Sequence, residues 1–454
     1  MEQHIGADSL TSITAPAITV RKCPLCEREV SPDTLGFLEC TCGWGGPDDP
    51  LESARGLSRI FMRLDRRIAN AIARRDLRVF AQRKAPPAAD GILYTLILLT
   101  ASTAIHLVMY GALIGLTALS VQLAIQHAWL GTLLTALCAV MFLAAVMHWT
   151  GRMKGIQFPR EQLPHLDAAL REVSSRVGGP LPHRVILVPG TQWAVFERHP
   201  LRRFFSPERI LVLGVGALPL MTIDEAKAVL AHEMAHYRYA HTLLHRYIAS
   251  AEAQARYIID LMLEAAGAQR RRIQRRRIRG MGTQGADLAA FFVWLVALPL
   301  ALIWQIFHLL RLAESRHAEF RADAAATRAY GAGLFIGGLS AIRAARHMVY
   351  GGSVQATIAM ERGEASFYAE MRRHITALPP EIVKNIRFKA LHAYRSLENS
   401  HPAEPDRVRA ALFVGSDMPV ADGGLGLPAR DLIVPQGQAN ADEIEKKLTR
   451  LLFA

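Results

Sequence analysis

The stretch Thr222-Ile-Asp-Glu-Ala-Lys-Ala-Val-Leu-Ala-His-Glu-Met-Ala-His236 decides how the rest of the chain is interpreted. Thr222 followed three residues later by Glu225 is a capping box, which marks the first turn of a helix. Apolar residues then recur at helical spacing, so His232 and His236 are expected on one face of that helix. Two imidazoles placed in this way are typical of a zinc site, and Glu233 can act as general base toward a water molecule.

A catalytic zinc site needs a third protein ligand, and the best candidate lies downstream. Such a zinc ion takes three protein ligands and leaves a fourth position open. Glu319 and Asp323 are four residues apart, so they share one face of a helix. Glu319 can bind the metal, while Asp323 can accept the free ring N–H of a ligand histidine. A solvated helical turn is the alternative interpretation, but the incomplete two-histidine site favours the first.

Three segments together resemble a known family of membrane zinc peptidases. Ala231-His-Glu-Met-Ala-His236, followed by Ser315-Arg-His-Ala-Glu-Phe-Arg-Ala-Asp323, is similar to the pattern of the membrane gluzincin peptidases, which include the HtpX heat-shock protease and the CAAX prenyl protease. The segment from Ser400-His-Pro402 to Arg407-Val408 is similar to that family's late His-Pro…Arg segment. The three segments occur in the family's order across roughly residues 155 to 412.

The resemblance implies a fold, a cofactor and a substrate class. The fold class is α+β, mainly α, with a zincin-type peptidase domain over 155–412 that contains a small sheet. The implied cofactor is one catalytic Zn²⁺, and the substrate is a polypeptide, either unfolded or a membrane protein. The implied zinc ligands are His232, His236 and Glu319, with Glu233 as catalytic base and Asp323 as hydrogen-bond partner of a ligand.

The resemblance is less specific for two further residues and for one strand. His401 and Arg407 are expected near the catalytic site, where they would stabilise the tetrahedral oxyanion. The family's usual Asn-Ala-Phe-Ala strand stands here as Gln192-Trp-Ala-Val-Phe196, so the resemblance does not identify the strand that pairs with substrate.

Composition allows several domains and points to a membrane. The chain has 454 residues, 51% of them apolar, and a formal net charge of +13, which permits two or three domains with their own cores. Basic charge alone does not separate a nucleic-acid partner from a lipid partner. Residues 1–20 are polar and lack a secretory signal, so they are expected to form a mobile tail in the cytoplasm.

Four of the five cysteines lie close together and predict a second metal site. Cys23, Cys26, Cys40 and Cys42 form two pairs within residues 21–46, typical of a zinc ribbon with a structural Zn²⁺ held by four thiolates. The alternative is a group of unpaired thiols in a reducing compartment. Zinc ribbons bind nucleic acids and proteins alike, so the pattern identifies no partner.

Residues 51–85 form a basic amphipathic helix by pattern. Apolar residues repeat at three and four positions along one face, and arginines occupy the other. The apolar positions are Leu57, Ile60, Phe61, Leu64, Ile68 and Ile72. Ahead of a membrane segment, such a helix is expected on anionic lipid. No base-reading residues accompany it, so nucleic acid is not favoured.

The segment 92–150 is predicted to form two transmembrane helices, that is, a hairpin. Residues Ile92 to Trp149 include no Asp, Glu, Lys or Arg, and the stretch is too long for one crossing. Basic residues flank both outer ends and are absent from the connection near 122–127. Both ends are therefore expected in the cytoplasm, and the chain in a bacterial-type inner membrane with a cytoplasmic active site.

A third apolar segment, 288–310, raises a question of topology. One crossing between His236 and Glu319 would put metal ligands on opposite sides of the bilayer, so the number of crossings there must be even. Three arrangements remain open: a dip that returns at Pro299, a helix along the interface, or an apolar helix packed against the first two spans. The basic run Arg270–Arg279 is expected to anchor to lipid.

The remaining parts of the chain are short. Val185–Val188 and Arg209–Leu213 predict strands of a small sheet beside the zinc helix. Residues 413–454 are expected to form a loop followed by a short amphipathic helix. The sequence gives no information on the oligomeric state.

Two functions of different classes follow from the sequence. The first is a membrane-bound zinc endopeptidase that acts in membrane protein quality control. The second is a membrane-tethered scaffold in which the ribbon recruits a partner and the peptidase fold is inactive. Glu233 favours the enzyme, because a scaffold needs no general base.

Overall fold

The structure is a computed structural model of the chain. It describes residues 20–83 except 25, 43, 47 and 48, then 92–147, 155–198, 208–239, 247–260, 284–351, 366–397, 401–415, 428–438 and 441–453. The expected tail over 1–19, the basic run Arg270–Arg279 and part of the 413–437 loop lie outside these residues.

The chain divides into two compact units. Unit 1 consists of 1–88, 153–240 and 315–454, and unit 2 of 89–152 and 241–314. The described strands, all in unit 1, are β1 (Arg21–Lys22), β2 (Glu29–Val30), β3 (Ile156–Pro159), β4 (Arg184–Val188), β5 (Trp193–Arg198) and β6 (Glu208–Gly214). The helices of unit 1 are α1 (Gly56–Arg83), α4 (Pro164–Val177), α5 (Ile223–Tyr239), α8 (Ala332–Gly351), α10 (Phe367–Ala377), α11 (Pro380–Ala390), α12 (Glu404–Val414) and α13 (Asp442–Phe453).

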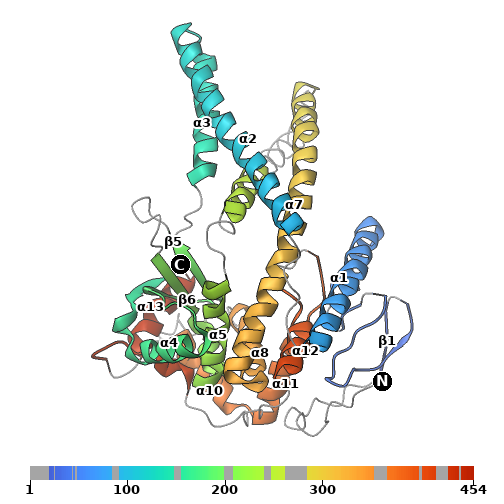
Figure 1. Ribbon diagram of the computed structural model, residues 1–454, viewed down its shortest axis with the longest axis vertical. Coiled ribbons are helices and arrows are strands. Elements are labelled where there is room, and N and C mark those ends of the chain that lie inside the picture. Colours follow the sequence, from blue (N-terminus) through green and yellow to red (C-terminus); the bar gives the residue numbers. More distant parts are fainter. Residues whose placement is uncertain are drawn as a thin grey trace. The chain divides into compact units, whose positions relative to one another are not determined.

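A four-stranded sheet with the order β3-β4-β6-β5 lies beside α4 and α5 (Figure 1). β4 and β6 are parallel, and the two outer pairs are antiparallel. Side chains alternate along β6: Leu211 and Leu213 join the main core, whereas Ile210 and Val212 form a second cluster on the opposite face. The two predicted strands are present, and the segment that replaces the family's usual strand forms β5 at one edge.

Helix α5 begins with the predicted capping box. The Thr222 N–H donates to Glu225 Oε2 at 2.9 Å, and the Glu225 N–H donates to Thr222 Oγ1 at 3.2 Å, so this prediction is confirmed. The helix is buried on nearly all sides, as expected for a helix at the centre of a core. Its buried apolar residues are Ala226, Val229, Leu230, Ala231, Met234 and Ala235.

Helix α8 approaches α5 closely because two glycines face it. A Cβ atom on Gly338 would lie 2.8 Å from the carbonyl oxygen of Glu225 and 2.5 Å from a methyl group of Val229. The backbones can pack at this distance only without a side chain there. α8 therefore supports the face of α5 on which Phe335 and His232 meet.

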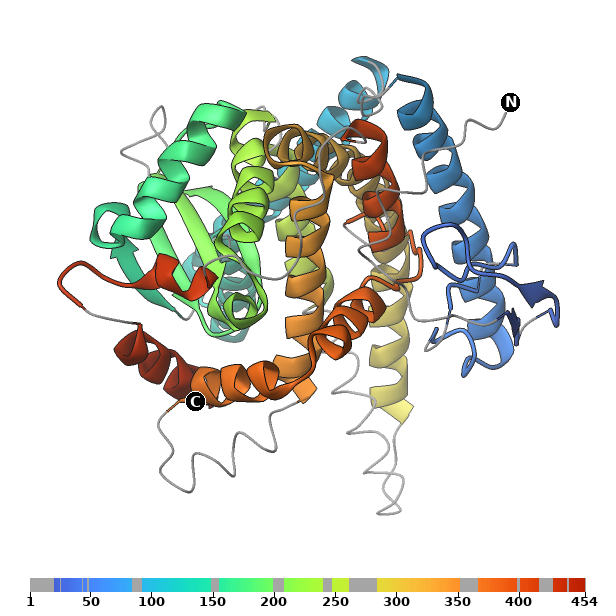
Figure 2. The same cartoon turned by 90° about the horizontal axis from the view of Figure 1, so that it is seen from below.

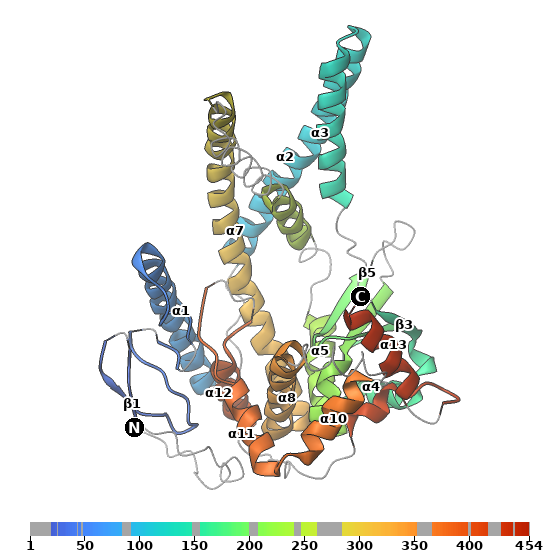
Figure 3. The same cartoon turned by 180° about the vertical axis from the view of Figure 1, so that it is seen from behind.

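The N-terminal ribbon has two short antiparallel strands, β1 and β2. Helix α1 lies next to the ribbon and packs beside α12 (Figure 2). α10 packs beside the C-terminal helix α13 (Figure 3), so the predicted amphipathic helix at the C-terminus docks on the peptidase core.

Helix α1 exposes part of its apolar stripe and buries polar residues against the rest of unit 1. The helix buries Arg66 and Asn70, whereas Ile60, Phe61 and Leu64 are 62%, 66% and 54% exposed. Arg66 is held because its guanidinium lies over the Tyr394 ring at 3.6 Å and pairs with Asp49. The contacts of Arg66 and the fully buried Phe80, whose ring packs against Phe320, attach α1 to the unit, rather than the predicted apolar stripe.

Unit 2 contains α2 (Ile92–Ile125) and α3 (Trp129–Met147), which pack along each other and are joined by a tight turn. Within α2, residues Leu96–Ile125 form the one described helix long and apolar enough to cross a membrane, and only 22% of its most apolar window is buried. The described apolar part of α3, Trp129–Ala144, is shorter. One spanning helix is thus indicated, while a membrane-spanning hairpin stays a prediction.

Helix α7 (Gln284–Tyr330) is continuous through Pro299, so the chain does not turn back there. Within unit 2, Phe307 lies in a buried cluster with Leu98 and Ile248. This contact agrees with the arrangement in which the apolar segment packs against the first helices. The mainly helical α+β fold class is confirmed in outline, and the boundaries of the predicted domains stay predictions.

Candidate metal centre

Three side chains from two distant helices converge in unit 1. The Nε2 atoms of His232 and His236 lie 3.2 Å apart. Each lies 3.4 Å from a carboxylate oxygen of Glu319. The site is buried: His232 and Glu319 are each 5% exposed. The three ligands predicted from sequence are therefore brought together.

The elements place these side chains by simple geometry. The four-residue spacing puts His232 above His236 on α5. Glu319 and Asp323 likewise share one face of α7, near its C-terminal end. Residues of α5 and of the C-terminal part of α7 lie in the same hydrophobic core. This packing brings the Glu319 carboxylate to the imidazoles of His232 and His236.

Asp323 and Arg407 fix the orientation of the first histidine. Asp323 Oδ1 lies 2.8 Å from His232 Nδ1, where it accepts the ring N–H and leaves Nε2 facing Glu319. Arg407 on α12 donates to Asp323 from Nε at 2.9 Å and from Nη2 at 2.6 Å. Arg407 is 5% exposed. Arg407 lies near the site, as expected. Both of these hydrogen bonds go to Asp323, the residue that orients the ligand His232.

Charges around the site stabilise a cation at its centre. Burial alone would lower the pKa of His232, but hydrogen bonds to Asp323 and Glu319 outweigh it and raise the pKa to about 10. Burial lowers the pKa of His236 to about 4, which favours a neutral imidazole. Burial opposes ionisation of Glu319, yet hydrogen bonds from His232 and His401 keep its pKa well below the ordinary range. A divalent cation on the same atoms would replace the proton on His232.

Glu233 lies next to the histidines in sequence and is 9% exposed. Burial raises the pKa of this carboxyl above its ordinary value, which brings it closer to neutral pH, where a general base is most effective. Its burial beside the site is compatible with the role predicted from the sequence.

His401 lies at the edge of the site. Its Nδ1 is 2.8 Å from Glu319 Oε2, and its side chain is 50% exposed. The residue can therefore contact both a ligand and a molecule that enters from solvent. The resemblance predicted its neighbourhood, which the structure matches, but did not predict its contact with Glu319.

The donor set fits zinc. Nitrogen and oxygen ligands at 2.0 to 2.2 Å from a tetrahedral Zn²⁺ are about 3.4 Å from one another, close to the three separations found here. The buried Glu319 Oε2 faces two ring nitrogens, His232 Nε2 at 3.4 Å and His401 Nδ1 at 2.8 Å. A bound cation would satisfy this oxygen.

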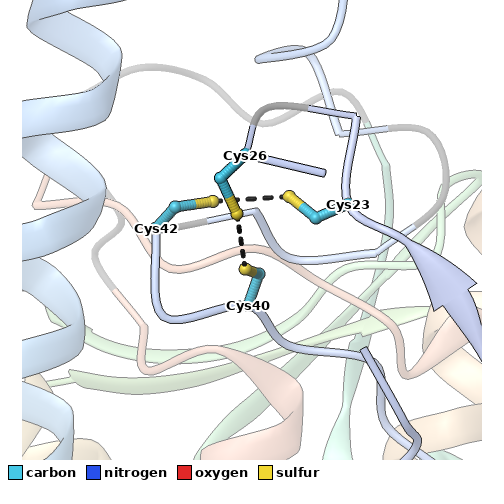
Figure 4. Close-up of side chains that lie close together, drawn as sticks. All are labelled: Cys23, Cys26, Cys40 and Cys42. Carbon is cyan, nitrogen blue, oxygen red and sulfur yellow. Dashed lines mark hydrogen bonds between the residues drawn. The ribbon is translucent and has the colours of Figure 1, made fainter. Parts of the chain in front are cut away.

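The four cysteines form a second candidate metal site (Figure 4). Their side chains point toward one another from two loops, with all four sulfur atoms within 4.8 Å. Cys23 and Cys42 are 3.4 Å apart and Cys26 and Cys40 3.5 Å, slightly less than the roughly 3.8 Å between thiolates on a tetrahedral Zn²⁺. A backbone hydrogen bond at Arg28 lowers the pKa of Cys26 to about 7, which favours the thiolate that metals bind, whereas burial raises the pKa of Cys42.

One neighbour of the site could not be found from the sequence. Phe335 on α8 stacks on the His232 ring, with ring centroids 5.9 Å apart. Among the apolar residues of α8 nothing in the pattern distinguishes it, since only the packing of α8 on α5 brings it there.

Comparison with known proteins identifies one family. The family model described as "Peptidase family M48" matches residues 181–412. The matched range contains His232, Glu319 and Arg407, and excludes the four cysteines and α2. Searches of curated proteins and of solved structures gave no significant match.

Proposed function

Since this chain belongs to peptidase family M48, we propose that it is a membrane-bound zinc endopeptidase whose active site faces the cytoplasm. The observation that carries the proposal is the convergence of His232, His236 and Glu319 within 3.4 Å of one another, with Glu233 buried beside them. A site with two imidazoles and one carboxylate is a common arrangement for a hydrolytic zinc.

Each residue has a distinct role in the proposed reaction. When bound, zinc polarises the scissile carbonyl and acidifies a water molecule. Glu233 accepts the proton from that water and returns it to the leaving amine. Asp323 holds the ring of His232 through Nδ1. His401, half-exposed, is the group we assign to the developing oxyanion, whereas Arg407 positions Asp323.

The edge strand β5 is the proposed binding surface for the polypeptide. β5 pairs with β6 on one side and is last in the sheet on the other. It also packs against α5, the helix that carries both histidines. An extended substrate can add to this edge through main-chain hydrogen bonds, which suits an enzyme that accepts many sequences. Unfolded or damaged membrane proteins are the proposed substrates.

Lipid is the proposed second partner. Large apolar residues along α2, among them Leu107 and Ile114, are each 70% exposed, which suits a hydrocarbon environment better than water. The exposed face of α1 combines Ile60, Phe61 and Leu64 with arginines further along. Such a face binds an anionic membrane surface through both apolar and electrostatic contacts.

Replacement of the general base tests the proposal. Glu233→Gln should retain two zinc ions per chain but lower the cleavage of casein by at least about 10²-fold, because general-base catalysis typically contributes 10²- to 10⁴-fold. Zinc is measured by elemental analysis of the detergent-solubilised full chain. His232→Ala, as the control, should lose one of the two ions. Full activity of Glu233→Gln would refute the role of Glu233 as general base, whereas no casein cleavage by the wild-type chain would favour a scaffold that binds partners through its ribbon.

A further inference from the structure

The four-cysteine ribbon is joined to the peptidase unit by a set of ion pairs whose arginines are largely buried and whose ribbon carboxylates are partly exposed. The segment between the cysteine pairs carries Asp33 and Glu39, and the latter immediately precedes Cys40. Glu39 accepts two hydrogen bonds from Arg395, at 3.0 and 3.2 Å, and one from Arg409 at 3.0 Å. Asp33 accepts a hydrogen bond from Arg409 at 2.6 Å. The ribbon thus supplies the anions and the peptidase unit the cations.

Arg395 is fully used by this contact. Its five N–H groups make five hydrogen bonds, two to Glu39, one to Asn70 and two to Asp406. The side chain of Arg395 is 10% exposed and that of Asp406 is 2% exposed. Ion pairs withdrawn from water in this way depend on exact placement of every partner, because a buried charge left alone is costly.

An aromatic contact attaches the same segment to the core. Phe37, in the loop that leads to Cys40, is 2% exposed. Its ring stacks on Phe388 at 5.8 Å and meets the edge of His392 at 5.1 Å. The ribbon is therefore not a free module on a linker.

The same helix, α12, reaches both metal sites. Asp406 and Arg409 contact the ribbon network, while Arg407, between them in sequence, binds Asp323. Asp323 in turn holds His232. Neighbouring residues of one helical turn thus connect Glu39, next to a cysteine ligand, with a histidine of the catalytic site.

We propose that the ribbon is a metal-dependent clamp on α12: its filled four-cysteine site holds Glu39 and Asp33 in place, and these hold Arg407 and Asp323 in the geometry that the catalytic site requires. The inference rests on the proposed function in that it takes His232, His236 and Glu319 as zinc ligands. Glu39 and Arg395 are positioning residues, because they touch neither metal nor substrate. Loss of metal from the ribbon would weaken the contacts of Arg407 with Asp323 and of Asp323 with His232.

The test measures metal retention in the full-length, detergent-solubilised chain. Glu39→Ala should release the catalytic zinc to a chelator roughly tenfold faster than the wild type, because loss of a partner behind a ligand typically weakens metal binding 10- to 100-fold. The His232→Ala chain, with ribbon zinc alone, defines the part of the release that belongs to the ribbon. Cys40→Ser should have the same effect as Glu39→Ala. Glu29→Gln, an exposed charge on β2 of the ribbon, is the matched control and should release zinc at the wild-type rate.

Hydrogen exchange separates a local effect from general unfolding. In Glu39→Ala, peptides of α12 should exchange faster, while those of α4 should keep wild-type rates. Wild-type zinc release in both Glu39→Ala and Cys40→Ser, or faster exchange in α4 as well as α12, would overturn the clamp. Failure of the proposed function would look different, since His232→Ala would then retain both zinc ions.

Discussion

At the scale of single residues, the site consists of local pairs that sequence could predict and a distant contact that it could not. The spacing of His232 and His236, and of Glu319 and Asp323, follows from helical geometry alone. Chemistry predicted that Asp323 accepts the ring N–H of a ligand histidine, and the structure places it 2.8 Å from Nδ1 of His232. The resemblance placed Arg407 near the site but gave it a role at the oxyanion, so its two hydrogen bonds to Asp323 were not predicted.

Asp323→Asn is predicted to weaken zinc binding. The amide keeps the shape of the carboxylate but removes its charge, so the His232 ring loses basicity and the buried Arg407 loses its counter-ion. The expected loss of affinity is about 10- to 100-fold, measured by competition with a chromophoric chelator. Asp224→Asn, an exposed carboxylate on the same helix as the histidines, is the control. Equal affinity for zinc in both variants would contradict the role of Asp323.

At the scale of elements, helices with local signals were predictable and their neighbours were not. The capping box of α5 is read from four residues and is present as expected. Which strands form the sheet edges depends on pairing between distant segments, so β5 could not be assigned from its sequence. α1 shows the same limit: the periodic pattern predicted a helix, but the contacts of Arg66 with Tyr394 and Asp49 decided which side is buried.

The contact between α4 and α5 should depend on pH. Glu172 on α4 lies 2.8 Å from Lys227 on α5, and the hydrogen bond from Lys227 lowers the pKa of this carboxyl. A lowered folded-state pKa contributes stability that is present above the ordinary value near 4.5 and is lost as the pH falls through the folded-state pKa. Glu172→Gln should therefore reduce the free energy of unfolding by about 0.5 kcal/mol at pH 7.

Denaturant unfolding of the solubilised chain at pH 7 and pH 3 measures this difference, which should shrink at the lower pH. Glu381→Gln, whose exposed partner lies three residues away on the same helix, serves as control. A deficit that is as large at pH 3 as at pH 7 would show that the charge of Glu172 is not responsible.

At the scale of the whole molecule, membrane association stays a prediction from composition, and the predicted number of crossings depends on the continuity of α7. The helix has no turn at Pro299, and Ala286 and Ala313 are separated by about 40 Å at 1.5 Å per residue. This exceeds the roughly 30 Å of a bilayer core. Within unit 2, Gln254 pairs with His106 at 3.1 Å and Tyr247 with Thr103 at 3.1 Å, whereas Arg256 and Asp260 pair with each other and stay exposed.

We therefore predict that the chain crosses the membrane in α7, and because the metal ligands must lie on one side, a second crossing is then required between His236 and α7. Single cysteines at Ala286 and Ala313, introduced with Cys138→Ala, should be labelled by an impermeant reagent from opposite sides of the membrane. Ser175 is exposed on α4, outside the apolar segments, and a cysteine there should be labelled from the same side as Ala313→Cys. Labelling of both α7 positions from one side would place that segment along the membrane surface.

The wide separation of the site's parts along the chain has a consequence during synthesis. His232 emerges from the ribosome long before Glu319, and Arg407 follows 175 residues after that histidine. A nascent polypeptide therefore carries both imidazoles before it has the third ligand, Glu319, and before it has Arg407. Under the proposed function, a chain without Glu319 holds two of the three zinc ligands, so it would not cut its own unfolded segments or neighbouring new proteins.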